Sequence, residues 1–149
     1  MDENYSLRPV MLADYEFIYD LNRRAMRTYV EPLWGWDEAL QREAFRQRFR
    51  LENHWLILVG KMAAGHIQRE SSPDREFIAQ ISLLPEYQGR GIGSAVVRAI
   101  QAEAAPAGKL VELRVLRTNP DARRLYERLG FVVFDSNETH EWMRWTPGG

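Results

Sequence analysis

Three glycines stand at alternate positions, 89, 91 and 93, within the stretch QGRGIGS that covers residues 88–94. An apolar run, FIAQISLLP, precedes this stretch, and a helical pattern, AVVRAIQAEAA, follows it. Glycine loses more backbone entropy on folding than any other residue, so three of them so close together require a reason. A glycine turn that leaves a strand and opens a helix presents several backbone N–H groups toward one point, where the helix dipole adds partial positive charge. The stretch therefore predicts a phosphate-binding turn.

Two other phosphate-binding patterns share glycines with this stretch. A P-loop requires Lys followed by Ser or Thr after its last glycine, whereas Gly93 is followed by Ser94 and an alanine. A dinucleotide-binding fingerprint fits more closely, because Gly89-x-Gly91-x-x-Ser94 nearly matches it and Glu112 follows at about the expected distance. That fingerprint belongs to the first unit of a large parallel sheet, however, and here it falls past mid-chain. A tight turn without a ligand would need only one glycine.

Apolar periodicity along the chain predicts a mixed α/β sheet with helices on its faces, in the element order βααβββαβαββ. Gly and Pro fall singly at the boundaries between segments, so we expect a single domain over residues 1–149. The expected strands cover residues 5–10, 54–59, 63–69, 75–84, 109–116, 131–135 and 139–145. The expected helices cover residues 12–27, 38–51, 92–105 and 120–129.

Specific residues mark several of these boundaries. Asp37 can cap the second helix, and Asn119 can cap the fourth. Pro120 fits the first turn of the fourth helix, and Gly130 suits a left-handed residue at its end. Residues 28–36, TYVEPLWGW, break the helical pattern, and we predict a loop there.

Two segments together resemble one family. Gln88-x-x-Gly91-x-Gly93 resembles the acyl-CoA binding signature of the GNAT N-acetyltransferase superfamily, and the whole segment LLPEYQGRGIGSAVV is similar to it. The segment NPDARRLYERLGF, residues 119–131, resembles the second CoA-contacting segment of the family at a matching separation. The chain is identified as a member of this family over residues 5–145. The resemblance implies the GNAT acyl-CoA N-acyltransferase fold, a central, mostly antiparallel sheet with helices on both faces.

The resemblance implies acetyl-CoA as the co-substrate. The amides of the glycine turn would hold the pyrophosphate, and the pantetheine arm would pair like an extra strand with residues 81–83. The implied CoA-binding residues are Ile81, Ser82, Leu83, Gln88, Gly89, Arg90, Gly91, Ile92, Gly93, Ser94, Asn119 and Tyr126.

The resemblance also implies a mechanism. A neutral primary amine would attack the acetyl carbon directly in a ternary complex, while a strand N–H polarises the thioester carbonyl. Tyr126 matches the tyrosine that protonates the leaving thiolate in the family. The alternative for Tyr126 is a core aromatic residue on the apolar stripe of its helix.

One family feature is missing from the sequence. Many relatives carry an acidic residue on the strand before the glycine turn, which deprotonates the amine, but here that strand offers only Gln80 and Ser82 as polar side chains. The remaining candidate bases are Glu31, His66 and His140, and water could also carry the proton. Each of the three could equally be a structural residue.

The expected loop before the second helix concentrates aromatic residues. In the family the first helix pair and its loop cover the acceptor site, so Tyr29, Glu31, Trp34 and Trp36 are candidate substrate-binding residues. The two tryptophans could wall a pocket for an apolar or cationic amine, or they could anchor the loop to the core.

Composition limits the partners. The chain has no cysteine and three dispersed histidines, so no thiol nucleophile and no metal site are expected. Lys and Arg number 20 against 21 Asp and Glu, which argues against nucleic-acid binding. The apolar run WLILV is far shorter than the roughly 20 residues of a membrane helix, and the polar N-terminal stretch is unlike a secretory signal.

These observations predict a cytoplasmic protein, a monomer or homodimer, whose partners are acetyl-CoA and an acceptor amine, with no nucleic acid and no membrane. The main alternative function is a non-catalytic acyl-CoA sensor on the same fold. A dinucleotide-binding oxidoreductase is a more distant alternative.

Overall fold

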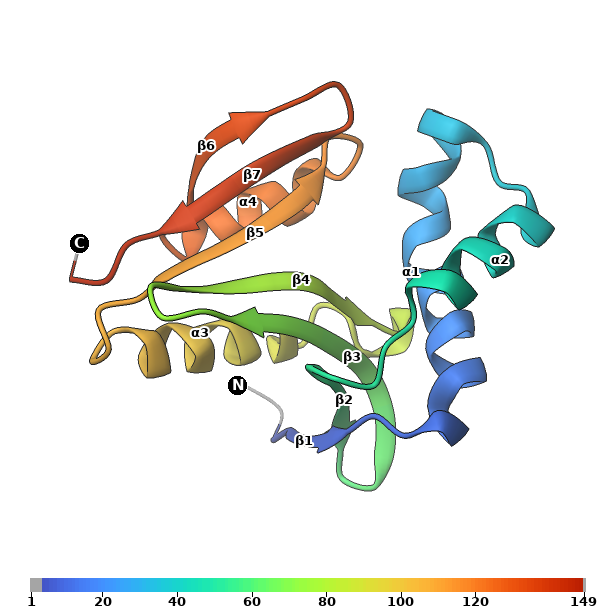
Figure 1. Ribbon diagram of the computed structural model, residues 1–149, viewed down its shortest axis with the longest axis horizontal. Coiled ribbons are helices and arrows are strands. Elements are labelled where there is room, and N and C mark those ends of the chain that lie inside the picture. The colour runs from blue at the N-terminus through green and yellow to red at the C-terminus, as the bar shows by residue number, and fades with distance from the viewer. Residues whose placement is uncertain (1–3, 149) are drawn as a thin grey trace.

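The computed structural model describes residues 4–148, and in this range the elements follow the predicted order βααβββαβαββ (Figure 1). The strands are β1 (Ser6–Pro9), β2 (His54–Val59), β3 (Met62–Ser71), β4 (Arg75–Leu83), β5 (Leu110–Leu116), β6 (Val132–Ser136) and β7 (His140–Trp145). The helices are α1 (Tyr15–Trp34), α2 (Glu38–Arg48), α3 (Ile92–Ala104) and α4 (Pro120–Arg128). Two short 3-10 turns cover Leu12–Asp14 and Pro85–Tyr87.

The strands form one sheet in the order β1-β2-β3-β4-β5-β7-β6. All neighbouring pairs are antiparallel except β4 and β5, which are parallel. This pair is joined only from Arg75 with Leu110 to Ile78 with Leu113. Beyond that point the two strands diverge, as Figure 1 shows, and the sheet opens into a wedge between them. The predicted mixed, mostly antiparallel sheet is confirmed.

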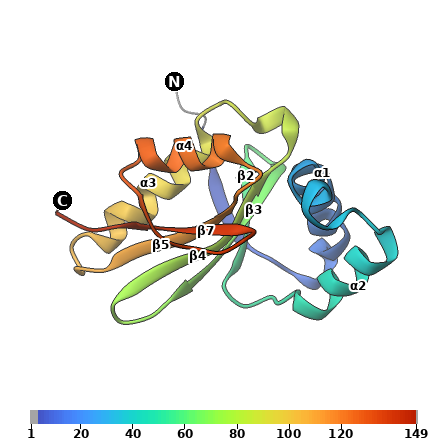
Figure 2. The same ribbon diagram turned by 90° about the horizontal axis from the view of Figure 1, so that it is seen from above.

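Helices cover both sides of the sheet (Figure 2). α3 and α4 lie on one side, where Val96, Tyr126 and Met143 belong to the larger buried cluster. α1 and α2 lie on the other side, where Ile18 and Phe45 belong to a second, smaller cluster. The opening between β4 and β5 therefore lies between two separately packed helical layers.

The first helix is longer than the sequence predicts. α1 extends through most of the residues 28–36, so the prediction of a loop there was wrong. Pro32 suggested a break, but it lies in the last turn, where it removes a single backbone hydrogen bond. The helix is also held from outside just before that turn, because the Thr118 hydroxyl donates to the Tyr29 carbonyl at 2.5 Å. Gly35, with a φ of 71°, then ends the helix.

The predicted helix caps are confirmed. The Asp37 side chain accepts a hydrogen bond from Leu40 N at 3.1 Å at the start of α2. The Asn119 side chain accepts one from Ala122 N at 3.2 Å at the start of α4. Gly130 follows α4 with a φ of 97°, the left-handed conformation expected there.

Candidate active site

The glycine turn starts α3 in a different way from the starts of α2 and α4. Gly91 is the N-cap residue of α3 with a φ of 82°, and Gly89 has a φ of 76°; other residues rarely adopt these values. Side chains cap α2 and α4, but none caps α3. Because the first N–H groups of a helix have no partner within it, those of α3 remain available as donors beside the positive end of the helix dipole. This arrangement fits a phosphate group.

A hollow of about 490 Å³ lies beside this turn, and we call it the central hollow. Its walls come from α1, the end of β4, the glycine turn and α4. The lining residues are Ala25, Met26, Tyr29, Ile81, Ser82, Leu83, Gln88, Gly89, Gly91, Ile92, Gly93, Ser94, Asn119, Asp121, Ala122, Leu125, Tyr126 and Arg128.

The structure brings together every residue that the family resemblance implied for CoA except Arg90. The Arg90 guanidinium instead lies over the Tyr87 ring, 5.1 Å from its centroid. Sequence reasoning missed the wall that α1 contributes through Ala25 and Met26, because these residues belong to no motif. It also missed Arg128, whose positive charge at the hollow suits an anionic ligand.

The end of β4 forms one wall of the central hollow and has no strand partner on its β5 side among the described residues. The Gln88 side chain ties the turn to this strand, since Nε2 donates to the Leu83 carbonyl at 3.0 Å. On the other side, Gly65 of β3 lies so close that a Cβ atom there would stand 2.2 Å from the Ser82 carbonyl oxygen. An isolated glycine inside a strand pattern was the available signal for this close approach.

Tyr126 belongs both to the core and to the hollow. Its side chain is 8% exposed, its ring packs edge-on against Phe131 at 5.8 Å between centroids, and it lines the central hollow. Burial raises the pKa of Tyr126 to about 12. The phenol therefore keeps its hydrogen at neutral pH and can donate it within the hollow.

A series of buried and half-buried polar side chains connects β2, β3 and α1 to β4. His54 Nε2 lies 2.6 Å from His66 Nδ1, and His66 Nε2 lies 2.9 Å from Asn22 Oδ1. Gln80 Nε2 lies 2.9 Å from the same oxygen and 3.5 Å from Ser82 Oγ. We call these five residues the polar chain. They are scattered through the sequence, and no motif linked them.

The structure places the candidate base His66 inside the polar chain and not at the central hollow. Its side chain is 1% exposed. Burial, together with the positive charges that His54 and Arg48 can carry, lowers the pKa of His66 to about 3. A ring that resists protonation this strongly is a weak base, so His66 does not fit the role of a general base.

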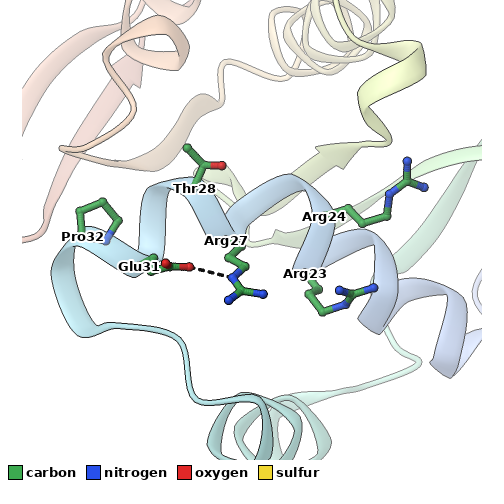
Figure 3. A pocket seen from close by; sticks show the side chains of 6 residues that line it. All are labelled: Arg23, Arg24, Arg27, Thr28, Glu31 and Pro32. Carbon is green, nitrogen blue, oxygen red and sulfur yellow. Dashed lines mark hydrogen bonds and ion pairs between the residues drawn. The ribbon is translucent and has the colours of Figure 1, made fainter.

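The other two candidate bases also lie outside the lining of the central hollow. Glu31 borders a separate open hollow of about 760 Å³ on the outer side of α1, where it accepts a hydrogen bond from Arg27 at 2.7 Å (Figure 3). His140 of β7 lies 2.8 Å from Thr139 Oγ1 through Nδ1. Burial, with a contribution from the charge of Arg114, lowers the pKa of His140.

The predicted acceptor residues separate in space. Tyr29 lines the central hollow. Trp34 is 58% exposed and lies 6.4 Å from the His140 ring between centroids. Trp36 lies under the Arg27 guanidinium at 5.7 Å and donates from Nε1 to Glu38 at 3.3 Å. Trp34 ends α1 and Trp36 follows the helix after Gly35, and of the four predicted acceptor residues only Tyr29 lines the central hollow.

Within residues 4–148, no group of three or more His, Cys, Asp or Glu side chains could hold a metal ion. In the same range, no helix combines the length and the apolar character that crossing a membrane requires.

The sequence of the chain matches known acetyltransferases. A model of the acetyltransferase (GNAT) family matches residues 15–131. Two mycothiol acetyltransferases from Corynebacterium glutamicum strains R and ATCC 13032 are 34% identical over 77 residues. The matched stretch covers 51% of this chain but only 26% of each of those relatives.

Solved structures agree in fold over nearly the whole chain. The PaiA N-acetyltransferase from Thermoplasma acidophilum, in complex with coenzyme A, has a TM-score of 0.78 and 16% identity over 96% of this chain and 99% of that one. The ribosomal-protein-S18-alanine N-acetyltransferase from Escherichia coli has a TM-score of 0.70 and 19% identity over 96% and 94% of the two chains.

Proposed function

Because the chain belongs to the GNAT acetyltransferase family, we propose that it transfers an acetyl group from acetyl-CoA to a primary amine, which attacks directly in a ternary complex. One observation carries the proposal. The uncapped start of α3 opens beside the unpaired end of β4, so that phosphate donors and a free strand edge face the same hollow. In a dinucleotide-binding protein Glu112 would have to bind the ribose, but it is buried and ion-paired with Arg75 and with Arg144.

Acetyl-CoA would supply the activated acetyl thioester, and the residues of the chain would bind and orient it. The backbone amides of residues 91–94 would donate to the pyrophosphate. A backbone N–H at the β4 edge would polarise the thioester carbonyl. The Tyr126 hydroxyl would donate its hydrogen to the departing sulfur. A pKa of about 12 makes this transfer uphill toward a thiolate of ordinary pKa ~8.5, so close positioning is required.

The residues where the acceptor amine would bind favour a neutral amine as the attacking group. Ser82 is the polar residue of β4 that lines the central hollow, and Gln80 contacts its hydroxyl. Neither can remove a proton as a carboxylate would. Water therefore takes the proton that the amine loses, and an acceptor already neutral at the working pH reacts best.

The test is a panel of primary amines incubated with acetyl-CoA while thiol release is followed. The chain contains no cysteine, so the protein adds no thiol background. Release that depends on one amine, with the acetylated amine confirmed by mass spectrometry, supports the proposal. Tight CoA binding in calorimetry without turnover of any amine would favour the acyl-CoA sensor. Binding of a nicotinamide dinucleotide without CoA binding would contradict both functions.

A further inference from the structure

The polar chain contains two histidines that acetyl transfer does not use directly, and its last member, Ser82, lines the central hollow. Asn22, His54 and His66 are 7%, 4% and 1% exposed, so the histidine end of the polar chain is shielded from water, whereas Gln80 is half-buried. Buried polar groups need partners, and the place of each hydrogen along the chain therefore follows from its neighbours.

The histidine end determines the first hydrogens. His54 Nδ1 lies 3.0 Å from the Arg50 carbonyl, which can only accept, so this nitrogen carries a hydrogen. In a neutral ring the other nitrogen, Nε2, is then an acceptor. It receives the hydrogen of His66 Nδ1, 2.6 Å away. His66 Nε2 is left with a lone pair and needs a donor from Asn22.

A charged arrangement is the alternative. If the oxygen of Asn22 faces His66 Nε2, that nitrogen must also carry a hydrogen, and the two rings share a net positive charge. Burial and the guanidinium of Arg48 on α2 oppose that charge and lower the pKa of His66. The pair is therefore neutral near pH 7. Asn22 then turns its NH₂ group toward His66, since the two ends of an amide are alike in shape and differ only in their hydrogen bonds.

The remaining hydrogens of the polar chain lie toward the central hollow. Asn22 gives its second hydrogen to the Gln80 amide, whose facing end, 2.9 Å away, is then the carbonyl oxygen. That oxygen lies 3.5 Å from Ser82 Oγ and accepts the hydroxyl hydrogen. The lone pairs of Ser82 are left to face the central hollow.

We propose that Ser82 accepts a hydrogen bond from the acceptor amine and that the polar chain sets this polarity. The inference rests on the proposed function. A hydroxyl that accepts an amine N–H leaves the nitrogen lone pair free to attack, whereas a donating hydroxyl would occupy that lone pair. His54, His66, Asn22 and Gln80 are thus positioning residues.

The reaction balances without a proton passing along the polar chain. The N–C bond forms as the C–S bond breaks, water takes one amine hydrogen as a proton, and Tyr126 gives its hydrogen to the sulfur. The Tyr126 phenolate, whose pKa is about 12, then regains a proton from water. The amides of Asn22 and Gln80 carry no proton in this scheme. Ser82 orients the attacking amine. The polar chain thus replaces the missing strand carboxylate in positioning the amine, but it does not take the proton.

The polarity can be measured without catalysis. Side-chain ¹⁵N NMR shifts at pH 7 report the protonation and the tautomer of each histidine, and the chain contains only three. A His140→Gln variant identifies the signals of the other two. We expect His54 and His66 both to be neutral, with the hydrogen on Nδ1. An imidazolium in the pair, or a hydrogen on His66 Nε2, would overturn the proposed polarity.

The kinetic test compares Ser82→Ala, Asn22→Asp and the double variant. Ser82→Ala removes the acceptor. Asn22→Asp places an acceptor-only group in the polar chain, so that a hydrogen moves to His66 Nε2, the Gln80 amide turns over and Ser82 becomes a donor. Each single change should lower kcat/KM for the amine about tenfold, the size of one ordinary hydrogen bond. The affinity for CoA should stay the same. Asn137→Asp, whose side chain already accepts hydrogen bonds from Thr139 N and His140 N, is the matched amide-to-acid control.

The double variant gives the decisive result. If Asn22 acts through Ser82, adding Asn22→Asp to Ser82→Ala should cause little further loss. Additive losses, or an unchanged kcat/KM in Ser82→Ala, would overturn the proposal. If Asn22→Asp does not fold, Ser82→Ala and the ¹⁵N shifts still decide. If CoA binds but no amine is acetylated, the proposed function fails together with the role of Ser82 toward an amine, while the ¹⁵N shifts still report the polarity.

Discussion

The two sides of the central hollow are built from different parts of the polypeptide. The cofactor side consists mainly of backbone: the strand edge of β4, the glycine turn and the uncapped start of α3. The acceptor side consists of side chains that α1 and the polar chain bring from distant positions. Backbone sites need particular residues at fixed spacing, and such spacing is visible in a sequence. Sites made of side chains need only packing partners, and these leave no local pattern.

The largest effect should follow from a change on the cofactor side. Tyr126→Phe keeps the buried ring and removes only the hydroxyl, so kcat should fall by about 10²–10⁴-fold, the usual cost of losing a general acid. Thermal stability and the affinity for CoA should change little. Steady-state kinetics together with calorimetry measure the three quantities.

The opposite outcome for Tyr126→Phe would contradict this division between the two sides. If Tyr126→Phe retains wild-type kcat in an assay limited by chemistry, Tyr126 is a packing residue and water protonates the thiolate. The chemical step would then depend on groups outside the cofactor side, and the division between the two sides would fail.

A smaller loss, confined to the affinity for CoA, should follow from placing a side chain in the glycine turn. Gly93 has no positive φ, and a Cβ there would meet Leu83 Cδ1 at an ordinary 3.8 Å, so the protein leaves room for the first side-chain carbon of Gly93→Val. Its branched side chain would crowd the ligand, and the Kd for CoA should rise about tenfold or more, a loss of ~1.4 kcal/mol. Calorimetry measures this, and a thermal melt should show no loss of stability. An unchanged Kd would place the phosphates away from this turn.

Gly65→Ala is the counterpart of that substitution. Its Cβ would stand 2.2 Å from the Ser82 carbonyl oxygen, so β4 must shift. We expect this variant to lose both stability and CoA affinity. The pair thus separates a glycine that leaves room for the ligand from one that leaves room for a neighbouring strand.

The contrast also explains what the sequence could predict. The element order, the caps Asp37 and Asn119, and the CoA-like motifs depend on neighbours along the chain and were visible. The polar chain was not visible, because Asn22 and Gln80 are 58 residues apart and meet only through packing. Pro32 was misleading for a related reason. Its local preference ends helices, but a hydrogen bond from Thr118 to the Tyr29 carbonyl holds α1 just before its last turn.

Stability should depend on pH mainly through the acceptor side. The pKa of His66 is about 3 in the folded protein, below the ordinary 6.5 of an unfolded chain, and burial also lowers the pKa of His54. Between these values the unfolded chain binds protons that the folded one does not. The free energy of unfolding should therefore be level above pH 6.5 and fall as the pH falls, by at most about 1.4 kcal/mol per pH unit for each histidine.

Denaturant titrations from pH 7.5 to 5 measure that slope. The depressed pKa values of Glu76 and Glu112 start from 4.5, so the loss of stability due to these carboxyls is concentrated below this range. His66→Gln should make the slope shallower by the share of His66, whatever its effect on stability at pH 7.5, while the lowered pKa values of His54 and His140 keep the remainder. A slope as steep as that of the wild type would assign the pH dependence to other groups.

The smallest effect should separate two tryptophans that the sequence grouped together. Trp34 is 58% exposed and lies near the His140 ring, whereas Trp36 is engaged by Arg27 and Glu38. Trp34→Ala should raise the KM for the amine about twofold to fivefold, the value of one aromatic contact, without changing the affinity for CoA. Trp36→Ala is the matched control and should leave both unchanged. If Trp36→Ala gives the larger increase, the amine approaches over the outer side of α1, beside Arg27 and Glu31 (Figure 3), and the acceptor side must be redrawn there.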